Sequence, residues 1–255
     1  MDYELRTAAT IQTELLPREV PLVPELRIAV RHLPMGAVAG DLYDFAAPDD
    51  HRIGILVADV TGHGIPAALI ASMVKVAFSS QTAHAGQPGQ LLGGVNQILS
   101  GHLVGGQFVT AVYVYIDTER HVVRYARAGH PPALLWQSAT QQVIELSEGA
   151  LFLGFDPSVT YPAADVPIHR GDRLVLYTDG VVEAVNGADQ PFGRHRLQTF
   201  IANNPELAAD DFASALLDRV RQWSVHDRYG NSFEDDLTLI VVDVISSVGT
   251  SLDRA

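Results

Sequence analysis

The sequence predicts an α+β fold in which β-sheets and helices form layers, and three observations support this class. Short strand-like segments follow one another between residues 108 and 146, and Asp117-Thr-Glu-Arg between the first two is typical of a hairpin turn. The predicted helices are grouped instead of alternating singly with strands, which disfavours a βαβ architecture. Hydrophobic residues make up 47% of the 255 residues, enough for a sizeable core in one large or two small domains.

The helices are predicted from their hydrophobic pattern. Residues 7–16 carry apolar side chains at helical spacing, and Pro17 ends the segment. Residues 66–78 are apolar on nearly every side, so we expect this long helix to be sandwiched against a sheet. Three further helices are predicted at residues 91–103, 195–202 and 211–223. We expect Asp210 to cap the last of them.

The strands are predicted where short apolar runs are bounded by turn residues. Arg52–Ala58 is almost continuously apolar, so we expect it at the centre of a sheet, and Arg173–Thr178 is expected to be buried as well. Further strands are predicted at residues 28–33, 108–116, 122–128, 133–136, 142–146 and 237–244.

The composition excludes several classes of protein. The 17 basic and 30 acidic residues give a net charge of −13, which argues against nucleic acid or an anionic membrane as the main partner. Because there is no cysteine, disulfides, thiolate nucleophiles and cysteine-ligated metals are excluded. The sequence shows no secretory leader and no apolar run long enough to cross a bilayer, so a cytoplasmic location is expected.

Four aspartates stand at the ends of predicted strands or strand-like runs: Asp41, Asp59, Asp179 and Asp235. Strand ends can meet at one rim of a sheet, where hydrophobic neighbours partly exclude water. Carboxylates gathered in such a place repel one another and lose hydration, so they need compensating cations. Oxygen-only donor sets suit hard ions such as Mg²⁺ or Mn²⁺. The pattern therefore predicts a metal-centred hydrolase.

Asp59 ends an apolar strand and is followed by a glycine-containing loop that leads into a helix. In this position its carboxylate is a candidate bridge between two cations, and the backbone carbonyl of Val60 is a candidate further ligand. Gly62 and Gly64 would allow a close approach of the backbone or a positive φ angle. An ordinary strand-to-helix loop would explain the same pattern.

Two other acidic pairs surround the remaining aspartates. Gly40 would allow an unusual backbone angle that aims Asp41 inward, whereas a turn with a solvated acid explains Asp44. Asp235 and Asp236 are adjacent charges at the mouth of a buried strand, which is costly without a partner, although a surface loop would also explain them.

Asp179 is followed by Gly180, and Asp-Gly is also a common turn dipeptide, so this pair alone is ambiguous. The six-residue apolar run before it favours the functional interpretation.

The ten histidines do not form a zinc motif, because no His-Glu-x-x-His is present. His63 lies beside the predicted site and is a candidate proton donor to a leaving oxygen. His130 is better explained as a structural hydrogen-bonding group at a strand end. A serine nucleophile motif of the Gly-x-Ser-x-Gly kind is absent.

These segments, in this order, resemble the RsbU-like serine/threonine phosphatases, the SpoIIE-type branch of the metal-dependent protein phosphatase 2C superfamily. The resemblance covers nearly the whole chain, from about Ile11 to Val244, and the combination of motifs is highly specific. The family usually has Gly-Gly where this chain has Ala39-Gly40. The matching motifs are Ile11-Gln-Thr-Glu-Leu-Leu-Pro17, Gly40-Asp41-Leu-Tyr-Asp44, Ala58-Asp59-Val-Thr-Gly-His-Gly64, Phe108-Val-Thr110, Ala128-Gly-His-Pro131, Leu174-Val-Leu-Tyr-Thr-Asp179-Gly180 and Asp235-Asp-Leu-Thr238.

The resemblance implies a four-layer α-β-β-α sandwich with two central antiparallel sheets and with two Mn²⁺ or Mg²⁺ ions at one end. Asp59 would bridge both ions, Val60 would offer its carbonyl, and Asp41, Asp179 and Asp235 would complete the ligand shells, partly through water. Asp59 and Asp41 would thus be catalytic as well as metal-binding. This branch lacks the phosphate-binding arginine of its eukaryotic relatives, and the sequence offers no obvious substitute.

The expected activity is hydrolysis of phosphoserine or phosphothreonine by a metal-activated water. By resemblance, the substrate would be a phosphorylated STAS-domain anti-sigma-factor antagonist in a partner-switching pathway. Two alternatives remain at this point. One is a catalytically silent module that binds a partner, and the other is a hydrolase of small phosphoesters.

The resemblance also implies a domain organisation. Residues 1–20 would be a linker-type helix, residues 21–245 the phosphatase domain and residues 246–255 a flexible tail. The family often carries a sensory module before this helix, so we expect the sensor to be a separate chain or to have been removed. Ile11, Leu15 and Leu16 are candidates for a dimeric coiled coil, although packing on their own domain would explain them equally well.

Overall fold

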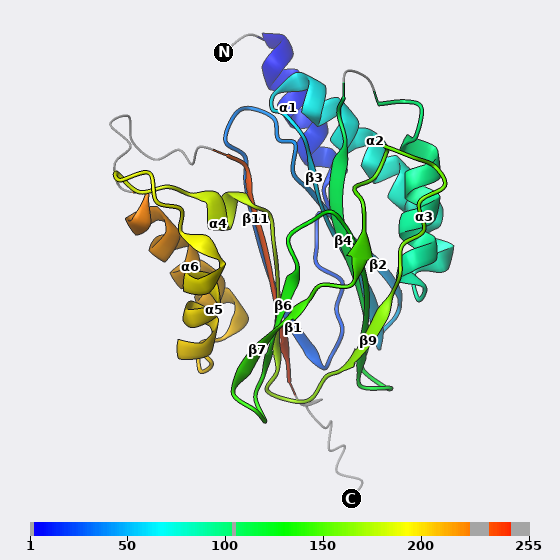
Figure 1. The fold of residues 1–255 in the computed structure, drawn as a ribbon. Coiled ribbons are helices and arrows are strands. Elements are labelled where there is room, and N and C mark those ends of the chain that lie inside the picture. Colours follow the sequence, from blue (N-terminus) through cyan, green and yellow to red (C-terminus); the bar gives the residue numbers. More distant parts are fainter. Residues whose placement is uncertain (1–2, 104–105, 225–234, 246–255) are drawn as a thin grey trace, which may run out of the picture.

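The computed structural model describes residues 3–103, 106–224 and 235–245, and in it two β-sheets lie face to face with helices on both outer sides (Figure 1). This confirms the predicted four-layer α-β-β-α sandwich. The expected tail at residues 246–255 and the acidic Glu234 lie outside the described residues. None of the helices in the described ranges is long and apolar enough to cross a membrane.

Sheet A has five strands, and every pair of adjacent strands in it is antiparallel. Its order is β1 (Leu26–Leu33), β11 (Leu237–Val244), β10 (Arg173–Tyr177), β6 (Ala133–Gln137) and β7 (Gln142–Leu146). Strand β11 therefore lies between β1 and β10, which brings Asp235, just before β11, next to the end of β10.

Sheet B is antiparallel except at one edge, where the two-residue strand β8 runs parallel to β5. Strand β9 also pairs with β5. The order is β2 (Leu42–Asp49), β3 (Arg52–Val60), β4 (Val109–Asp117), β5 (Val122–Ala128) and β8 (Gly149–Ala150), with β9 spanning Ala164–Pro167.

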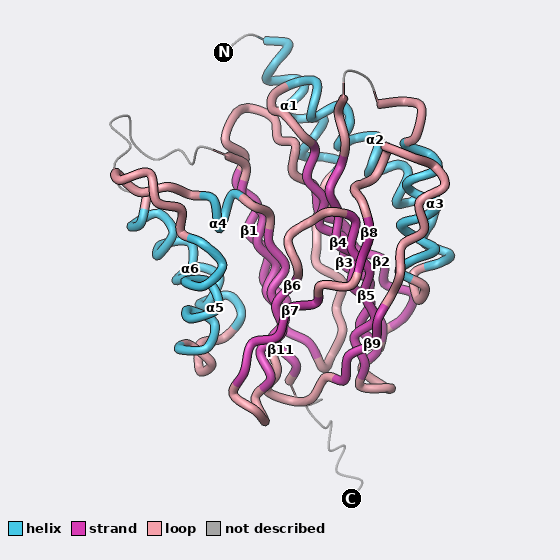
Figure 2. Tube along the Cα trace, viewed as in Figure 1, coloured by secondary structure: helices cyan, strands magenta, loops and turns pink. Residues whose placement is uncertain are grey.

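The helices form the two outer layers, shown in cyan in Figure 2. Sheet B is covered by α2 (Ile65–Gln81) and α3 (Pro88–Leu99), with the short turn Thr82–His84 between them and α1 (Tyr3–Leu15) against α2. On sheet A lie α4 (Gly180–Glu183), α5 (Gly193–Asn203) and α6 (Ala209–Trp223).

Three hydrophobic clusters join the four layers: one between the sheets and one under each helical layer. Strand β11 shows why its sequence is continuously apolar. Leu239 and Val241 face α5 and α6, whereas Ile240 and Val242 face the other sheet. A strand that is buried on both faces has no polar alternation to display.

Several expectations need correction. Strand β2 was not predicted from the sequence, and neither were β8 and β9. Asp210 does not cap α6, because the helix starts at Ala209 and Asp210 lies in its first turn. Helix α2 packs one side on sheet B as expected, but Leu69 and Val76 on its other side are 63% and 66% exposed.

The N-terminal segment has apolar residues both in contact with its own domain and exposed to solvent. Leu16, just after α1, packs against the core of its own domain, whereas Ile11 is 59% exposed. Gln12 contacts the domain through a paired hydrogen bond: its side-chain amide donates to the Ala39 carbonyl at 2.6 Å, and its side-chain oxygen accepts from the Ala39 N–H at 2.8 Å. Helix α1 is thereby connected to the segment that leads into Asp41.

Candidate metal centre

The four predicted aspartates come together at one end of the sandwich, and each sheet supplies two of them. Asp41 directly precedes β2 and Asp59 lies near the end of β3, both in sheet B. Asp179 directly follows Thr178 at the end of β10, and Asp235 precedes β11, both in sheet A. The start of β11 and helix α4 lie at the same rim in Figure 1. The negative charges of Asp179 and Asp235 act on Asp59, and that of Asp59 acts on Asp41.

Burial and mutual repulsion raise the pKa of these carboxyl groups. The pKa of Asp59 rises to about 7, mainly because of burial and then because of Asp179 and Asp235. For Asp179 the pKa rises to about 6, from burial and then from Asp235. Burial also raises the pKa of Asp235. Among the described residues, no lysine or arginine is a main influence on these groups. Divalent cations would relieve this repulsion.

Asp41 is held more tightly than the others. It is 2% exposed, and its Oδ2 accepts hydrogen bonds from Thr178 Oγ1 at 2.8 Å and from Thr238 Oγ1 at 2.6 Å. Both threonines belong to the sheet A side, so Asp41 joins the two sheets. Its pKa is raised well above the usual value, first by burial and then by Asp59.

The loop after β3 lies close to Gly40. A Cβ atom on Gly40 would lie 3.0 Å from the carbonyl oxygen of Val60 and 3.5 Å from that of Gly62. Gly40 does not have a positive φ, and the close approach of these carbonyls is the reason why a residue without Cβ fits there. Gly62 and Gly64 do have positive φ angles, of 91° and 74°.

Ala39 fits where the family usually has glycine. Ala39 is fully buried and does not have a positive φ, and both its N–H and its carbonyl form hydrogen bonds with the side chain of Gln12. The methyl group therefore causes no backbone strain.

Asp236 has a different role from Asp235. Its Oδ1 accepts from the Met35 N–H at 2.7 Å and its Oδ2 from the Gly40 N–H at 2.6 Å, so both oxygens hold the segment before Asp41. Asp235 is exposed, and its carboxylate accepts the Asp236 N–H at 2.8 Å. This arrangement supports the choice of Asp235 as the metal-binding member of the pair.

Asp44 is not a solvated acid in a turn. It lies in β2, is 5% exposed, and forms an ion pair with Lys75 of α2 at 2.6 Å. Burial raises the pKa of Asp44, and Lys75 opposes that shift. The expectation of a solvated turn was wrong because Asp44 faces helix α2 from within β2. A buried acid at this position interrupts the apolar pattern by which the strand would be predicted.

The two singled-out histidines differ in burial. His63 is exposed and lies near Asp235, where it opposes the rise in the pKa of Asp235 that burial causes. His130 is 1% exposed, with its Nδ1 2.8 Å from Thr110 Oγ1 of β4 and its Nε2 3.1 Å from the Tyr177 carbonyl of β10. Burial lowers the pKa of His130 to about 3, so it is a neutral link between the sheets.

All of the candidate ligands are oxygen atoms, which suit hard divalent ions. The carboxylates would share the coordination of each ion with other oxygen ligands. No three acidic or histidine side chains within the described residues converge closely enough to hold one ion by themselves. Pairs of carboxylates would therefore be supplemented by a backbone carbonyl and by water, which suits Mg²⁺ and Mn²⁺ because these ions commonly retain water ligands.

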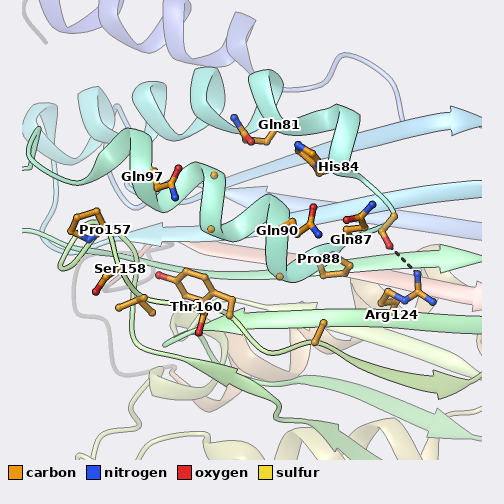
Figure 3. Close-up of a pocket in the computed structure, with 17 residues that line it drawn as sticks. Gln81, His84, Gln87, Pro88, Gln90, Gln97, Arg124, Pro157, Ser158 and Thr160 are labelled. Carbon is orange, nitrogen blue, oxygen red and sulfur yellow. Dashed lines mark hydrogen bonds between the residues drawn. The ribbon is translucent and has the colours of Figure 1, made fainter.

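A cavity of about 820 Å³ lies elsewhere, between α3 and the loop 157–163 (Figure 3). Its walls carry Gln81, Gln90 and Gln97, and none of the four aspartates lines it. Arg124 is its one arginine or lysine, and that guanidinium is already bonded to Asp165 and to a backbone carbonyl. Arg124 therefore does not take the place of the phosphate-binding arginine found in the eukaryotic relatives.

A four-layer sandwich of two sheets between helical layers is the fold of solved protein phosphatase 2C domains, and in this chain an acidic rim built from both sheets lies at one end of it. The family described as Stage II sporulation protein E (SpoIIE) matches residues 49–245. The chain belongs to this family, the SpoIIE-type phosphatases.

Two curated relatives come from Bacillus subtilis. Phosphoserine phosphatase RsbU is 30% identical over 242 residues, which cover 94% of this chain and 69% of RsbU. Phosphoserine phosphatase RsbP is 29% identical over 248 residues, which cover 94% of this chain and 58% of RsbP. The chain thus spans roughly three fifths to two thirds of these relatives.

Solved structures show the same fold. The SiaA-PP2C domain of Pseudomonas aeruginosa has a TM-score of 0.80 at 23% identity, covering 94% of this chain and 95% of that domain. The catalytic domain of the serine/threonine protein phosphatase PstP, solved with two manganese ions, has a TM-score of 0.60 at 14% identity, covering 87% and 99%.

Proposed function

We propose that this chain is a serine/threonine phosphatase that uses two Mn²⁺ or Mg²⁺ ions, held by Asp41, Asp59, Asp179, Asp235 and the Val60 carbonyl. The observation that carries the proposal is the gathering of acidic side chains from both sheets, with pKa values of about 7 for Asp59 and about 6 for Asp179. Such a cluster is unfavourable unless cations bind to it. The names of RsbU and RsbP support phosphoserine as the hydrolysed group.

The residues of the chain have distinct roles in this proposal. Asp59 lies where it can serve both ions, since it is coupled to aspartates of both sheets. Asp41 is oriented by two threonine hydroxyls, and Gly40 leaves room beside the Val60 carbonyl. When bound, the ions supply a water of lowered pKa and neutralise charge on the phosphoryl oxygens. His63 is the candidate donor of a proton to the leaving serine or threonine oxygen.

The proposed substrate is a phosphoprotein, and specifically a STAS-domain anti-sigma-factor antagonist in a partner-switching pathway. The support is the relation to RsbU and RsbP over almost the full length of this chain. In the same proposal the enzyme is cytoplasmic, takes its input from a sensory module, and dimerises through α1. Ile11 is an exposed apolar residue of α1 on which such pairing would depend.

The decisive experiment measures release of phosphate from a phosphoserine protein with and without Mn²⁺. We expect Mn²⁺-dependent hydrolysis by the wild type and none above background by Asp59→Ala. A matched control is Asp218→Ala, which removes an exposed acid on α6 of the same chain. Equal rates for the wild type and Asp59→Ala would end the proposal.

A second experiment identifies the substrate. Asp179→Asn weakens a metal ligand and leaves the rest of the surface unchanged, so it is a suitable trap in a pull-down. We expect enrichment of a phosphorylated STAS-domain protein relative to the wild type. Comparing rates on that protein and on p-nitrophenyl phosphate separates a protein phosphatase from a hydrolase of small phosphoesters.

A further inference from the structure

His32 occupies a position where the strand pattern calls for an apolar side chain. Along β1, Ile28 and Val30 pack against the core between the sheets, and His32 is the next residue on that face. Its ring lies beside Tyr43 of sheet B, with 5.7 Å between the ring centroids. In the β1–β11 register His32 is directly opposite Thr238.

The ring is connected to the metal centre by hydrogen bonds. His32 Nδ1 lies 3.0 Å from Thr238 Oγ1, and Thr238 Oγ1 lies 2.6 Å from Asp41 Oδ2. A threonine hydroxyl has a single proton to donate. When Asp41 is an ionised metal ligand it can only accept, so the Thr238 proton is directed at Asp41. Thr238 must then accept from His32, which requires the proton of the ring to be on Nδ1.

Thr178 completes the same arrangement from the neighbouring strand. Its hydroxyl donates to Asp41 Oδ2 at 2.8 Å and accepts the Thr238 backbone N–H at 2.9 Å. Both hydroxyl protons therefore converge on one oxygen of Asp41. Among the described residues, Oδ1 receives no hydrogen bond, which leaves that oxygen free for an ion.

We propose that His32 is a positioning residue of the metal centre: by donating from Nδ1 to Thr238, it directs the Thr238 hydroxyl to Asp41 Oδ2 and so presents Oδ1 to the metal. The inference rests on the proposed metal-dependent function. Burial lowers the pKa of His32, with Asp236 opposing the shift, and a neutral ring with one proton is what the arrangement needs. Partners of this kind orient metal ligands and tune affinity.

Three variants test the proposal. The side-chain amides of asparagine and glutamine place an N–H donor near different nitrogens of the histidine ring, and leucine has no donor. His32→Asn places an N–H donor near the position of Nδ1, His32→Gln places one near Nε2, and His32→Leu removes the donor at similar volume. Mn²⁺ affinity is measured by calorimetry on the full chain. We expect His32→Asn to bind within about 3-fold of the wild type, and His32→Gln and His32→Leu to bind about 10-fold or more weakly.

A double-mutant cycle tests the route through Thr238. If His32 acts on Asp41 through that hydroxyl, His32→Leu should weaken Mn²⁺ binding much less in a Thr238→Val background than in the wild type. Full additivity would overturn the proposed route. Circular dichroism and thermal unfolding of each metal-free variant show whether it is folded.

A spectroscopic readout does not depend on any variant. In the Mg²⁺-loaded wild type, long-range ¹H–¹⁵N NMR of the His32 ring should show a proton on Nδ1 and none on Nε2. A ring protonated only on Nε2 would overturn the proposal, as would wild-type Mn²⁺ affinity in His32→Leu or an equally weak His32→Asn. A wild type that binds neither ion would instead overturn the proposed function itself.

Discussion

The acidic rim contains two kinds of aspartate: Asp236, whose oxygens bind backbone N–H groups, and the aspartates proposed as metal ligands. Asp236 is 7% exposed, and both of its carboxylate oxygens accept backbone N–H groups. Asp59 and Asp179 have strongly raised pKa values and face other acids across the rim. Asp41 is intermediate, with one oxygen bonded by threonines and one free of donors in the described part of the chain. Asp236 thus holds the backbone in place, whereas the acids proposed as metal ligands are marked by raised pKa values or by an oxygen without a donor in the described residues.

The largest effect should come from removing the central ligand. Asp59→Asn keeps the shape of the side chain but loses the charge that two cations would share. We expect Mn²⁺ affinity and phosphatase activity to fall by more than about 100-fold, beyond the loss typical of an outer-shell partner. Calorimetry and phosphate release measure the two effects. Asp44→Asn, which alters a buried acid paired with Lys75, should leave Mn²⁺ affinity nearly unchanged.

The comparison between neighbours is sharpest at positions 235 and 236. Asp236→Ala leaves two backbone N–H groups without their acceptor, so we expect the metal-free protein to lose about 2–4 kcal/mol of unfolding free energy. Asp235→Asn removes repulsion and should change that free energy by less than about 0.5 kcal/mol, or raise it. Urea unfolding in the presence of a chelator compares them. Equal losses for the two variants would contradict the distinction between scaffold and ligand.

Buried His130 extends the comparison to the pH dependence of the unfolding free energy. The pKa of buried His130 is about 3 in the folded protein and near 6.5 when unfolded, so the unfolded state binds more protons between these values. The stability contributed by neutral His130 is therefore complete above about pH 6.5 and is lost as the pH falls towards 3, by about 1.4 kcal/mol per pH unit.

Urea unfolding at pH 7, 6, 5 and 4.5 measures this slope. His130→Asn should flatten it. An unchanged slope in His130→Asn would show that His130 is not the group responsible.

The smallest effect concerns the connection between α1 and the rim. Gln12→Ala removes both hydrogen bonds to the Ala39 backbone, and we expect a loss of about 1–2 kcal/mol in unfolding free energy. Because Ala39 and Gly40 precede Asp41, Mn²⁺ affinity should fall by a few-fold. Glu14→Ala, an exposed change on the same helix, is the control. A Gln12→Ala protein that matches this control would show that α1 does not support the rim.

The sequence predicts the fold class, and it marks Asp59, Asp179 and Asp235 by the apolar strands beside them, whereas Asp41 precedes β2, which was not predicted. Such positions are visible without coordinates, since strand ends are marked by the change from apolar to acidic residues. Strand β2 was missed because Asp44 on its buried face breaks the alternation, and only Lys75, 31 residues away, explains that acid. Pairing over such a distance leaves no local pattern.

The supporting residues of the site were beyond sequence reasoning for a similar reason. Thr178 and Thr238 stand in apolar strands, and nothing in their neighbours shows that both hydroxyls point to Asp41. The different roles of Asp235 and Asp236 depend on which side chain meets the segment before Asp41. His32 breaks the apolar pattern of β1, which is the one signal that could have identified it.

Asp41 belongs to one sheet through the backbone and to the other through its hydrogen bonds, and the remaining acids are likewise divided between the sheets. In the proposed function, a partly folded chain with only one sheet formed therefore has half of the metal-binding oxygens. A divalent ion that binds at the rim then stabilises the fully assembled sandwich over such an intermediate, so that metal binding is coupled to folding.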